Sequence, residues 1–174
     1  MTREIYRGKV VHLFVESATL PNGKTFDLEV VRHPGASAVV PLREDGKVIL
    51  IHQYRHAAGG YIYEVPAGKL SAGEAPESCA AREMEEEIGY RAGKFELLTT
   101  IFTAPGFCDE QIHLFLATGL IRTGQALGED EVLEVVEMPF EEVMRKIEDR
   151  TIRDAKSIVA LELAYRRAKK RGWI

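Results

Sequence analysis

Residues 68–90 read GKLSAGEAPESCAAREMEEEIGY, and the fold class follows from this stretch. Pro76 suits the first turn of a helix, because the N–H that proline lacks has no partner there in any case. Gly89 suits the position just past a helix end, where the left-handed backbone conformation favours glycine. The stretch therefore predicts a glycine-containing loop followed by a helix over 76–88.

The acidic residues of this helix gather on one side. At 3.6 residues per turn, Glu83, Glu86 and Glu87 share an arc of about 100°, although like charges at this spacing repel each other. Clustered carboxylate oxygens suit Mg²⁺ or Mn²⁺, whereas the alternative is an ordinary solvated acidic face. Two features favour the metal site. The loop at 66–69 contains a glycine that lets the backbone approach a ligand, and Arg82 can orient a carboxylate.

The spacing of these residues resembles the signature of the Nudix hydrolase family. The signature positions are occupied by Gly68, Glu74, Arg82, Glu83, Met84, Glu86, Glu87, Gly89 and Tyr90. The resemblance implies an α/β fold, a Nudix-type α/β/α sandwich with a mixed sheet. It also implies hydrolysis of a nucleoside diphosphate linked to another moiety, with Mg²⁺ or Mn²⁺ held by the glutamates of the signature.

By this resemblance, Glu83 and Glu87 are expected as metal ligands, with the carbonyl of Ala67 completing a site. Glu86 is expected next, as a further ligand with a catalytic role. The supporting positions have structural or orienting roles, and they are Gly68, Glu74, Arg82 and Gly89. Of these, Glu74 is expected to support the loop or the helix N-terminus, and Arg82 to orient the carboxylates.

The general base is expected on a later loop, at 124–131, rather than in the signature. Glu129 is the first candidate and Glu131 the second, and the alternative is that both are ordinary loop charges. Either carboxylate has the chemistry needed to take a proton from an attacking water.

A second motif narrows the substrate. Pro105 follows Gly89 by sixteen residues within the run TAPGFCDE at 103–110, a pattern that resembles the ADP-ribose pyrophosphatase subfamily. The proline and glycine also predict a rigid turn suited to form one wall of a pocket, or else an ordinary turn. The expected substrate-binding residues are Arg55, Glu64, Pro105, Gly106, Phe107 and Glu110. Arg55 can grip phosphate oxygens with two N–H groups, the alternative being a surface arginine.

Hydrophobic patterning and turn residues predict two units. Strands at 9–15 and 26–31 form an N-terminal β-hairpin element, residues 1–34, which by the family resemblance serves dimerisation; Pro34 and the glycine after it mark the seam. Residues 35–174 form the hydrolase domain. Its further strands are expected at 36–42, 47–54, 61–65, 95–102, 112–118 and 131–138, and its further helices at 140–149 and 154–170.

Composition excludes several classes of protein. The 174 residues carry a formal net charge of −4, which does not favour sequence-independent nucleic-acid binding. The absence of an apolar run of about 18 residues predicts no transmembrane helix. Cys79 and Cys108 show no metal-ligand spacing, so we expect reduced thiols and a cytoplasmic protein. The acidity is concentrated in 74–87, which holds six glutamates and one arginine.

The expected reaction is Mg²⁺-dependent hydrolysis of ADP-ribose to AMP and ribose 5-phosphate. Two alternatives stand beside it: a pyrophosphatase for another nucleoside diphosphate sugar such as GDP-mannose, and a non-catalytic binding module with the same fold.

Overall fold

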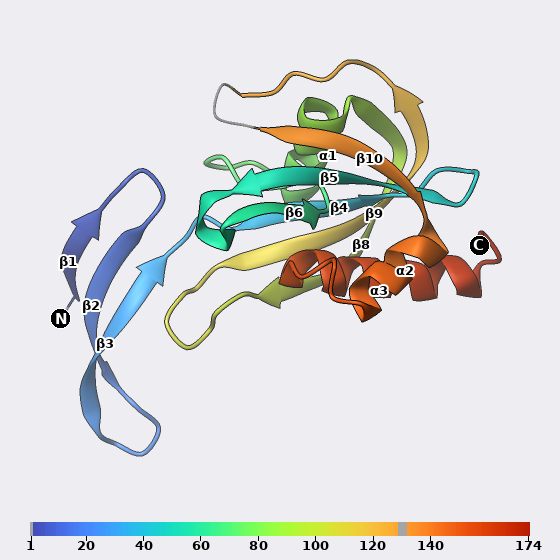
Figure 1. The fold of residues 1–174 in the computed structure, drawn as a ribbon. Helices are drawn as coiled ribbons and strands as arrows, with labels where there is room; N and C mark the ends of the chain where they lie inside the picture. The colour runs from blue at the N-terminus through green and yellow to red at the C-terminus, as the bar shows by residue number, and fades with distance from the viewer. Residues whose placement is uncertain (1, 129–131) are drawn as a thin grey trace.

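The computed structural model describes residues 2–128 and 132–174. It begins with a three-stranded antiparallel sheet that projects from the body of the molecule (Figure 1). The strands are β1 (Thr2–Arg7), β2 (His12–Thr19) and β3 (Thr25–Arg32). The sequence predicted only two strands in this element. It missed β1, which pairs with β2 and extends the hairpin to three strands.

The body contains a mixed four-stranded sheet in the order β7-β4-β9-β8. These strands are β4 (Ala36–Pro41), β7 (Ala67–Lys69), β8 (Tyr90–Phe102) and β9 (Gln111–Arg122). β4 lies parallel to β9, and the other neighbours are antiparallel. The short strand β7 was not predicted, because three residues around a glycine give no hydrophobic pattern.

A second, antiparallel sheet has the order β10-β5-β6. Its strands are β5 (Lys47–Arg55), β6 (Gly60–Glu64) and β10 (Leu133–Pro139), and a short 3-10 helix, His56–Ala58, connects the first two. The helices are α1 (Pro76–Ile88), α2 (Phe140–Glu148) and α3 (Ala155–Lys170). Helix α1 has the predicted bounds, and α2 and α3 differ from prediction by one residue at one end.

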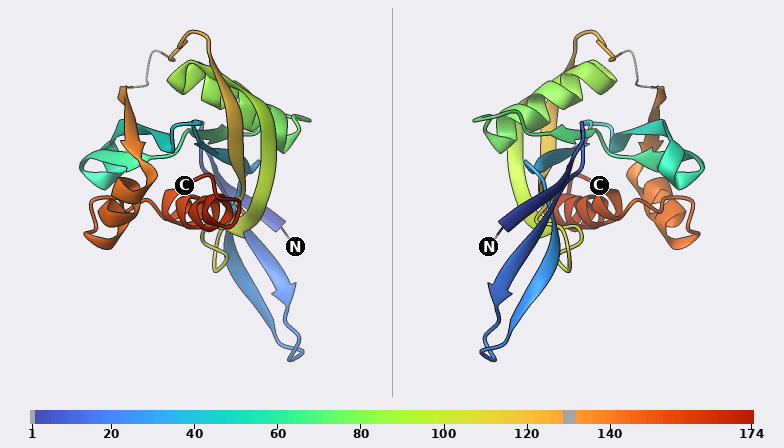
Figure 2. Two further views of the ribbon diagram at one scale, coloured as in Figure 1. Left: turned by 90° about the vertical axis from the view of Figure 1, so that its right-hand side faces the viewer. Right: turned by 90° about the vertical axis from the view of Figure 1, so that its left-hand side faces the viewer.

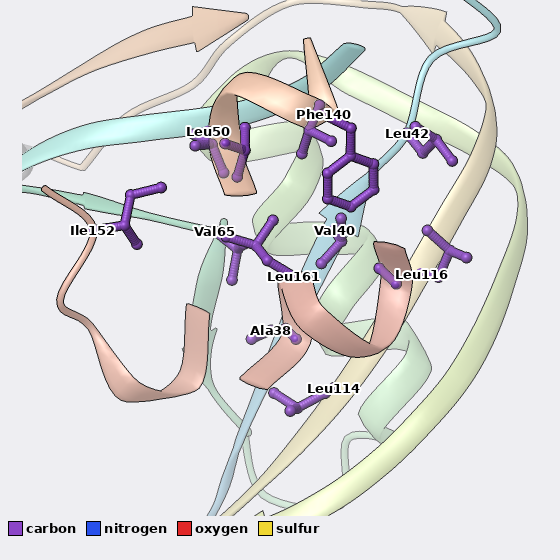
Figure 3. Close-up of a cluster of buried hydrophobic side chains, with 14 of the residues drawn as sticks. Ala38, Val40, Leu42, Leu50, Val65, Leu114, Leu116, Phe140, Ile152 and Leu161 are labelled. Atoms are coloured by element: carbon purple, nitrogen blue, oxygen red, sulfur yellow. The ribbon is translucent and has the colours of Figure 1, made fainter. Parts of the chain in front are cut away.

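The helices lie on opposite sides of the strands, as Figure 2 shows for α1 and α3. Two hydrophobic clusters fill the resulting interfaces. The larger one joins the sheets to α2 and α3 and includes Val40, Leu50 and Phe140 (Figure 3). The smaller one joins the opposite face to α1 and includes Val39 and Met84. Neighbouring residues of β4 thus serve different clusters, as the alternation of side chains along a strand requires.

Strand β3 ties the N-terminal sheet to the loop between β8 and β9. The Val31 N–H donates to the Phe107 carbonyl at 2.7 Å, and the Asp109 N–H donates to the Val31 carbonyl at 3.2 Å. Arg32 forms an ion pair with Asp109 at 2.9 Å. The loop that contains the Pro-Gly-Phe run is therefore held from the N-terminal side.

Among the described residues, no helix is long and apolar enough to cross a membrane.

Candidate active site

Helix α1 buries two of its glutamates along with its apolar face. Ala80, Met84 and Ile88 pack into the smaller cluster. Glu83 and Glu87 are only 8% and 2% exposed. Glutamate is almost never buried to this extent unless it is paired, so these side chains do not form a solvated acidic face.

Gly68 in β7 lies against one of these carboxylates. A Cβ added at Gly68 would overlap the Glu83 carboxyl group, so a larger residue here would displace that carboxylate from its position. The neighbouring Ala67 N–H donates to Glu87 Oε2 at 2.9 Å. Because β7 pairs with β4, the core of the sheet fixes the backbone that orients both carboxylates.

Arg82 gathers three glutamates. Its Nε donates to Glu74 Oε1 at 2.9 Å, and its Nη1 donates to Glu83 Oε1 at 2.7 Å and to Glu86 Oε2 at 3.1 Å. The Arg82 guanidinium, helped by the Ser71 N–H, lowers the pKa of Glu74 to about 2. Arg82 thus connects the loop before α1 to the acidic face of the helix.

A pocket of about 800 Å³ opens over the buried carboxylates. Six of the residues that we expected at the site line it, namely Arg55, Ala67, Gly68, Glu83, Glu87 and Glu110. Glu110 is held in place by Thr103, whose Oγ1 donates to Glu110 Oε2 at 2.8 Å. The structure therefore brings carboxylates from α1 together with a guanidinium from the end of β5.

The Pro105–Phe107 run does not line this pocket. Pro105, Gly106 and Phe107 line a separate cavity of about 770 Å³, together with residues 27–30 of β3. Phe107 is 59% exposed. Apart from Glu64, the expected substrate-binding residues are therefore divided between two cavities within this chain.

Glu64 lies beneath the first pocket and does not line it. Its side chain is 4% exposed, and Arg55 contacts its Oε2 at 2.8 Å. Lys156 contacts its Oε1 at 2.7 Å. Sequence reasoning missed Lys156, which lies 92 residues from Glu64 and belongs to no motif.

The segment after β9 is fastened to the end of α1. Gly89, at φ +70°, ends the helix and accepts the Thr123 N–H at 2.7 Å through its carbonyl. The Ala126 N–H donates to the Glu86 carbonyl at 2.9 Å, and Gln125 Nε2 donates to the Glu87 carbonyl at 2.7 Å. The base candidates Glu129 and Glu131 lie outside the described residues.

The donors in the pocket fit a divalent cation. Two buried carboxylates, Glu83 and Glu87, present hard oxygen atoms, and Gln53 Oε1 is a buried acceptor with no partner among the residues described. The Glu86 carboxylate accepts a hydrogen bond from Arg82 and does not line the pocket. Within 2–128 and 132–174, no three His, Cys, Asp or Glu side chains converge closely enough to hold a metal by themselves. Water or substrate oxygens would complete the coordination, as is usual for Mg²⁺.

The model of the NUDIX domain family matches residues 31–161. An ADP-ribose pyrophosphatase of Bacillus subtilis is 45% identical over 91% of this chain and 87% of its own length. A methanol dehydrogenase activator of Bacillus methanolicus is 42% identical over 92% of this chain and 88% of its own. A GDP-mannose pyrophosphatase of Cronobacter sakazakii is 39% identical over 79% and 83%.

A solved structure described as an ADP compounds hydrolase has the same fold. It superposes with a TM-score of 0.86 over the whole of this chain and 95% of its own, at 24% identity. The chain therefore belongs to the Nudix family, as the signature at 68–90 indicated. It is a pyrophosphohydrolase of that family, so the alternative of a non-catalytic binding module is wrong.

Proposed function

We propose that this enzyme hydrolyses the diphosphate of ADP-ribose to AMP and ribose 5-phosphate with Mg²⁺ or Mn²⁺. One observation carries the proposal: the buried carboxylates of Glu83 and Glu87 face the same pocket as the Arg55 guanidinium. Two carboxylates and a guanidinium around one cavity suit an anionic substrate that binds together with a divalent metal ion. The relative from Bacillus subtilis supports ADP-ribose as the substrate.

In this proposal some residues bind the metal ion and others orient the residues that bind it. Glu83 and Glu87, with the Ala67 carbonyl, would hold the cation, and Glu86 would join them by turning away from Arg82. When bound, the cation neutralises phosphate oxygens and lowers the pKa of an attacking water. Arg82 and Glu74 orient these carboxylates through the contacts given above. Gly68 and Gly89 fix the backbone on either side of the helix.

In this proposal, residues outside the signature recognise the substrate. Arg55 contacts the diphosphate, because a guanidinium can bind two phosphate oxygens at once. Glu64 orients Arg55, and Glu110 accepts a hydrogen bond from a sugar hydroxyl or a metal-bound water. Pro105, Gly106 and Phe107 would recognise another part of the substrate from the separate cavity that they line.

Glu129 is the proposed general base, with Glu131 as the second candidate. Either one would take the proton of the attacking water as the bond between phosphorus and the bridging oxygen breaks.

We also propose that the protein acts as a homodimer through the N-terminal element, residues 1–34. Apolar side chains are exposed on its strands and connecting turns, and these are Ile5, Tyr6, Val10, Val11, Phe26 and Leu28. An exposed apolar surface of this kind is typical of a protein–protein contact.

GDP-mannose is the second candidate substrate, favoured by the relative from Cronobacter sakazakii.

Product analysis by ion-exchange chromatography tests the proposed cleavage of ADP-ribose. We expect AMP and ribose 5-phosphate in equal amounts from ADP-ribose, and no products when EDTA is added. Release of adenosine or inorganic phosphate as a primary product would contradict the proposed cleavage.

A further inference from the structure

Two cations share one buried carboxylate beneath the pocket. Lys156 Nζ lies 2.7 Å from Glu64 Oε1, while Nε and Nη2 of Arg55 each lie 2.8 Å from Glu64 Oε2. The Glu64 side chain is 4% exposed, so its negative charge depends on these neighbours rather than on water. Each oxygen of Glu64 therefore has its own cation.

The two cations differ in how firmly they are held. Lys156 also contacts Asp154 Oδ2 at 2.9 Å, and its side chain is 15% exposed. It lies in the first turn of α3, where the helix dipole disfavours a positive charge, so the two carboxylates offset an unfavourable position. Arg55 pairs with Glu64, is 41% exposed and lines the pocket.

We propose that Lys156 is a positioning residue that keeps Glu64 paired while Arg55 turns from Glu64 to the diphosphate of the substrate. This inference rests on the proposed function, in which Arg55 contacts the diphosphate. Without Lys156, moving Arg55 would leave a buried carboxylate with no cation, and breaking a buried ion pair in this way is strongly unfavourable. With Lys156 in place, the Glu64 carboxylate keeps a positively charged partner and therefore repels the incoming phosphate less.

The substitution Lys156→Met tests the inference in steady-state kinetics. We expect KM for the preferred nucleoside diphosphate sugar to rise about tenfold or more, because Arg55 stays on Glu64 and one charged contact to the substrate is lost. We expect kcat to change by less than about threefold, because the residues around the cation are untouched. Lys156→Arg restores the second charge and should return KM close to the wild-type value. An unchanged KM in Lys156→Met would overturn the inference.

A further substitution, this time at Glu64, distinguishes a positioning role of Lys156 from a purely structural one. In the Glu64→Gln background the group beneath the pocket is neutral and needs no counter-ion. We therefore expect Lys156→Met to have no further effect on KM in that background, which is the non-additivity of residues that act through one another. The same rise in KM in both backgrounds would contradict the inference.

Ser157→Ala is the matched structural control. Ser157 Oγ accepts the Val65 N–H at 2.9 Å and donates to Asp154, so it supports the same junction without contacting Glu64. We expect this variant to lower Tm and to leave KM unchanged. If it raised KM as much as Lys156→Met, the position of α3 rather than the charge would be responsible, and the inference would be wrong.

Binding of inorganic pyrophosphate provides a measurement that does not depend on turnover. With Mg²⁺ present in the calorimeter, we expect wild type to bind pyrophosphate about tenfold more tightly than Lys156→Met. Equal affinities, or no binding by wild type, would overturn the inference. A clear difference in pyrophosphate affinity without hydrolysis of ADP-ribose would instead refute only the proposed substrate.

Discussion

Glu83 and Glu87 differ from Glu85 on the same helix in both burial and partners. The first two are buried at the pocket, whereas Glu85 is partly exposed and pairs with Arg91 at 2.8 Å. We expect Glu83→Gln or Glu87→Gln to lower kcat about 100-fold or more, since each removes a proposed charged ligand of the cation, while Glu85→Gln serves as the control and keeps its activity. Circular dichroism should show the same fold in all three. Near-wild-type turnover in both pocket variants would contradict the metal assignment.

Glu74 gives the protein a defined dependence of stability on acid. Its pKa lies at about 2 instead of 4.5, chiefly because Arg82 donates hydrogen bonds to it. A carboxylate with a lower pKa in the folded state contributes stability that is fully present above the unfolded value and is lost as the pH falls through the folded value. We therefore expect Glu74→Gln to flatten the fall in the free energy of unfolding between about pH 4.5 and pH 2. Urea unfolding at stepped pH measures this.

Glu77→Gln is the control for this acid effect, because Glu77 is exposed in the first turn of α1. It should keep the wild-type slope. Identical slopes in wild type and Glu74→Gln would mean that Arg82 does not hold Glu74 as the distances indicate.

At the scale of elements, Gly89 at the end of α1 is constrained both by its backbone conformation and by a close neighbouring segment. Gly89 has φ +70°, and a Cβ there would come within 3.0 Å of the Gln125 nitrogen. Gly73 has a similar φ of +75° with nothing within 4 Å, so Gly73→Ala reports backbone strain alone. We expect Gly73→Ala to cost about 1 kcal/mol of stability, and Gly89→Ala to cost more because the 123–126 segment must move. Thermal unfolding compares them, and equal losses would argue against the close packing of that segment.

Hydrophobic alternation and turn residues predicted nearly every element of the body. Helix α1 was predicted to the residue because Pro76 and Gly89 mark both of its ends in the sequence itself. Strand β1 was missed because Thr2–Arg7 is exposed throughout and so lacks a buried face. The signature predicted that Gly68, Glu83 and Glu87 lie together, and in the structure they line one pocket. The pairing of Lys156 with Glu64 and the separate cavity at Pro105 depend on contacts between distant elements, which spacing along the chain does not reveal.

For the whole molecule, the proposed dimer makes a specific prediction about the N-terminal sheet. Phe26 is 48% exposed on β3, whereas Ile121 is 65% exposed on β9, far from that sheet in the chain's topology. We expect Phe26→Asp to weaken the dimer by placing a charge in an apolar contact, and Ile121→Asp to have no effect. Light scattering after size-exclusion chromatography should give twice 19.5 kDa for wild type. A monomeric wild type would refute the proposed dimer.

The charge of the molecule is distributed in a way that suits its proposed substrate. The acidic segment 74–87 supplies the carboxylates at one side of the pocket, while Arg55 and Lys156 line it as cations. A diphosphate is repelled by the first group alone and attracted once a divalent cation lies between them. The net charge of −4 therefore does not reveal the two cations that line the proposed site.

The most direct test of the account compares kcat/KM for ADP-ribose and GDP-mannose in the presence of Mg²⁺, with EDTA as the control. The proposal predicts turnover of both that depends wholly on the metal, with ADP-ribose preferred by about tenfold or more, a difference in transition-state binding of about 1.4 kcal/mol. A preference for GDP-mannose, or turnover that survives EDTA, would contradict it.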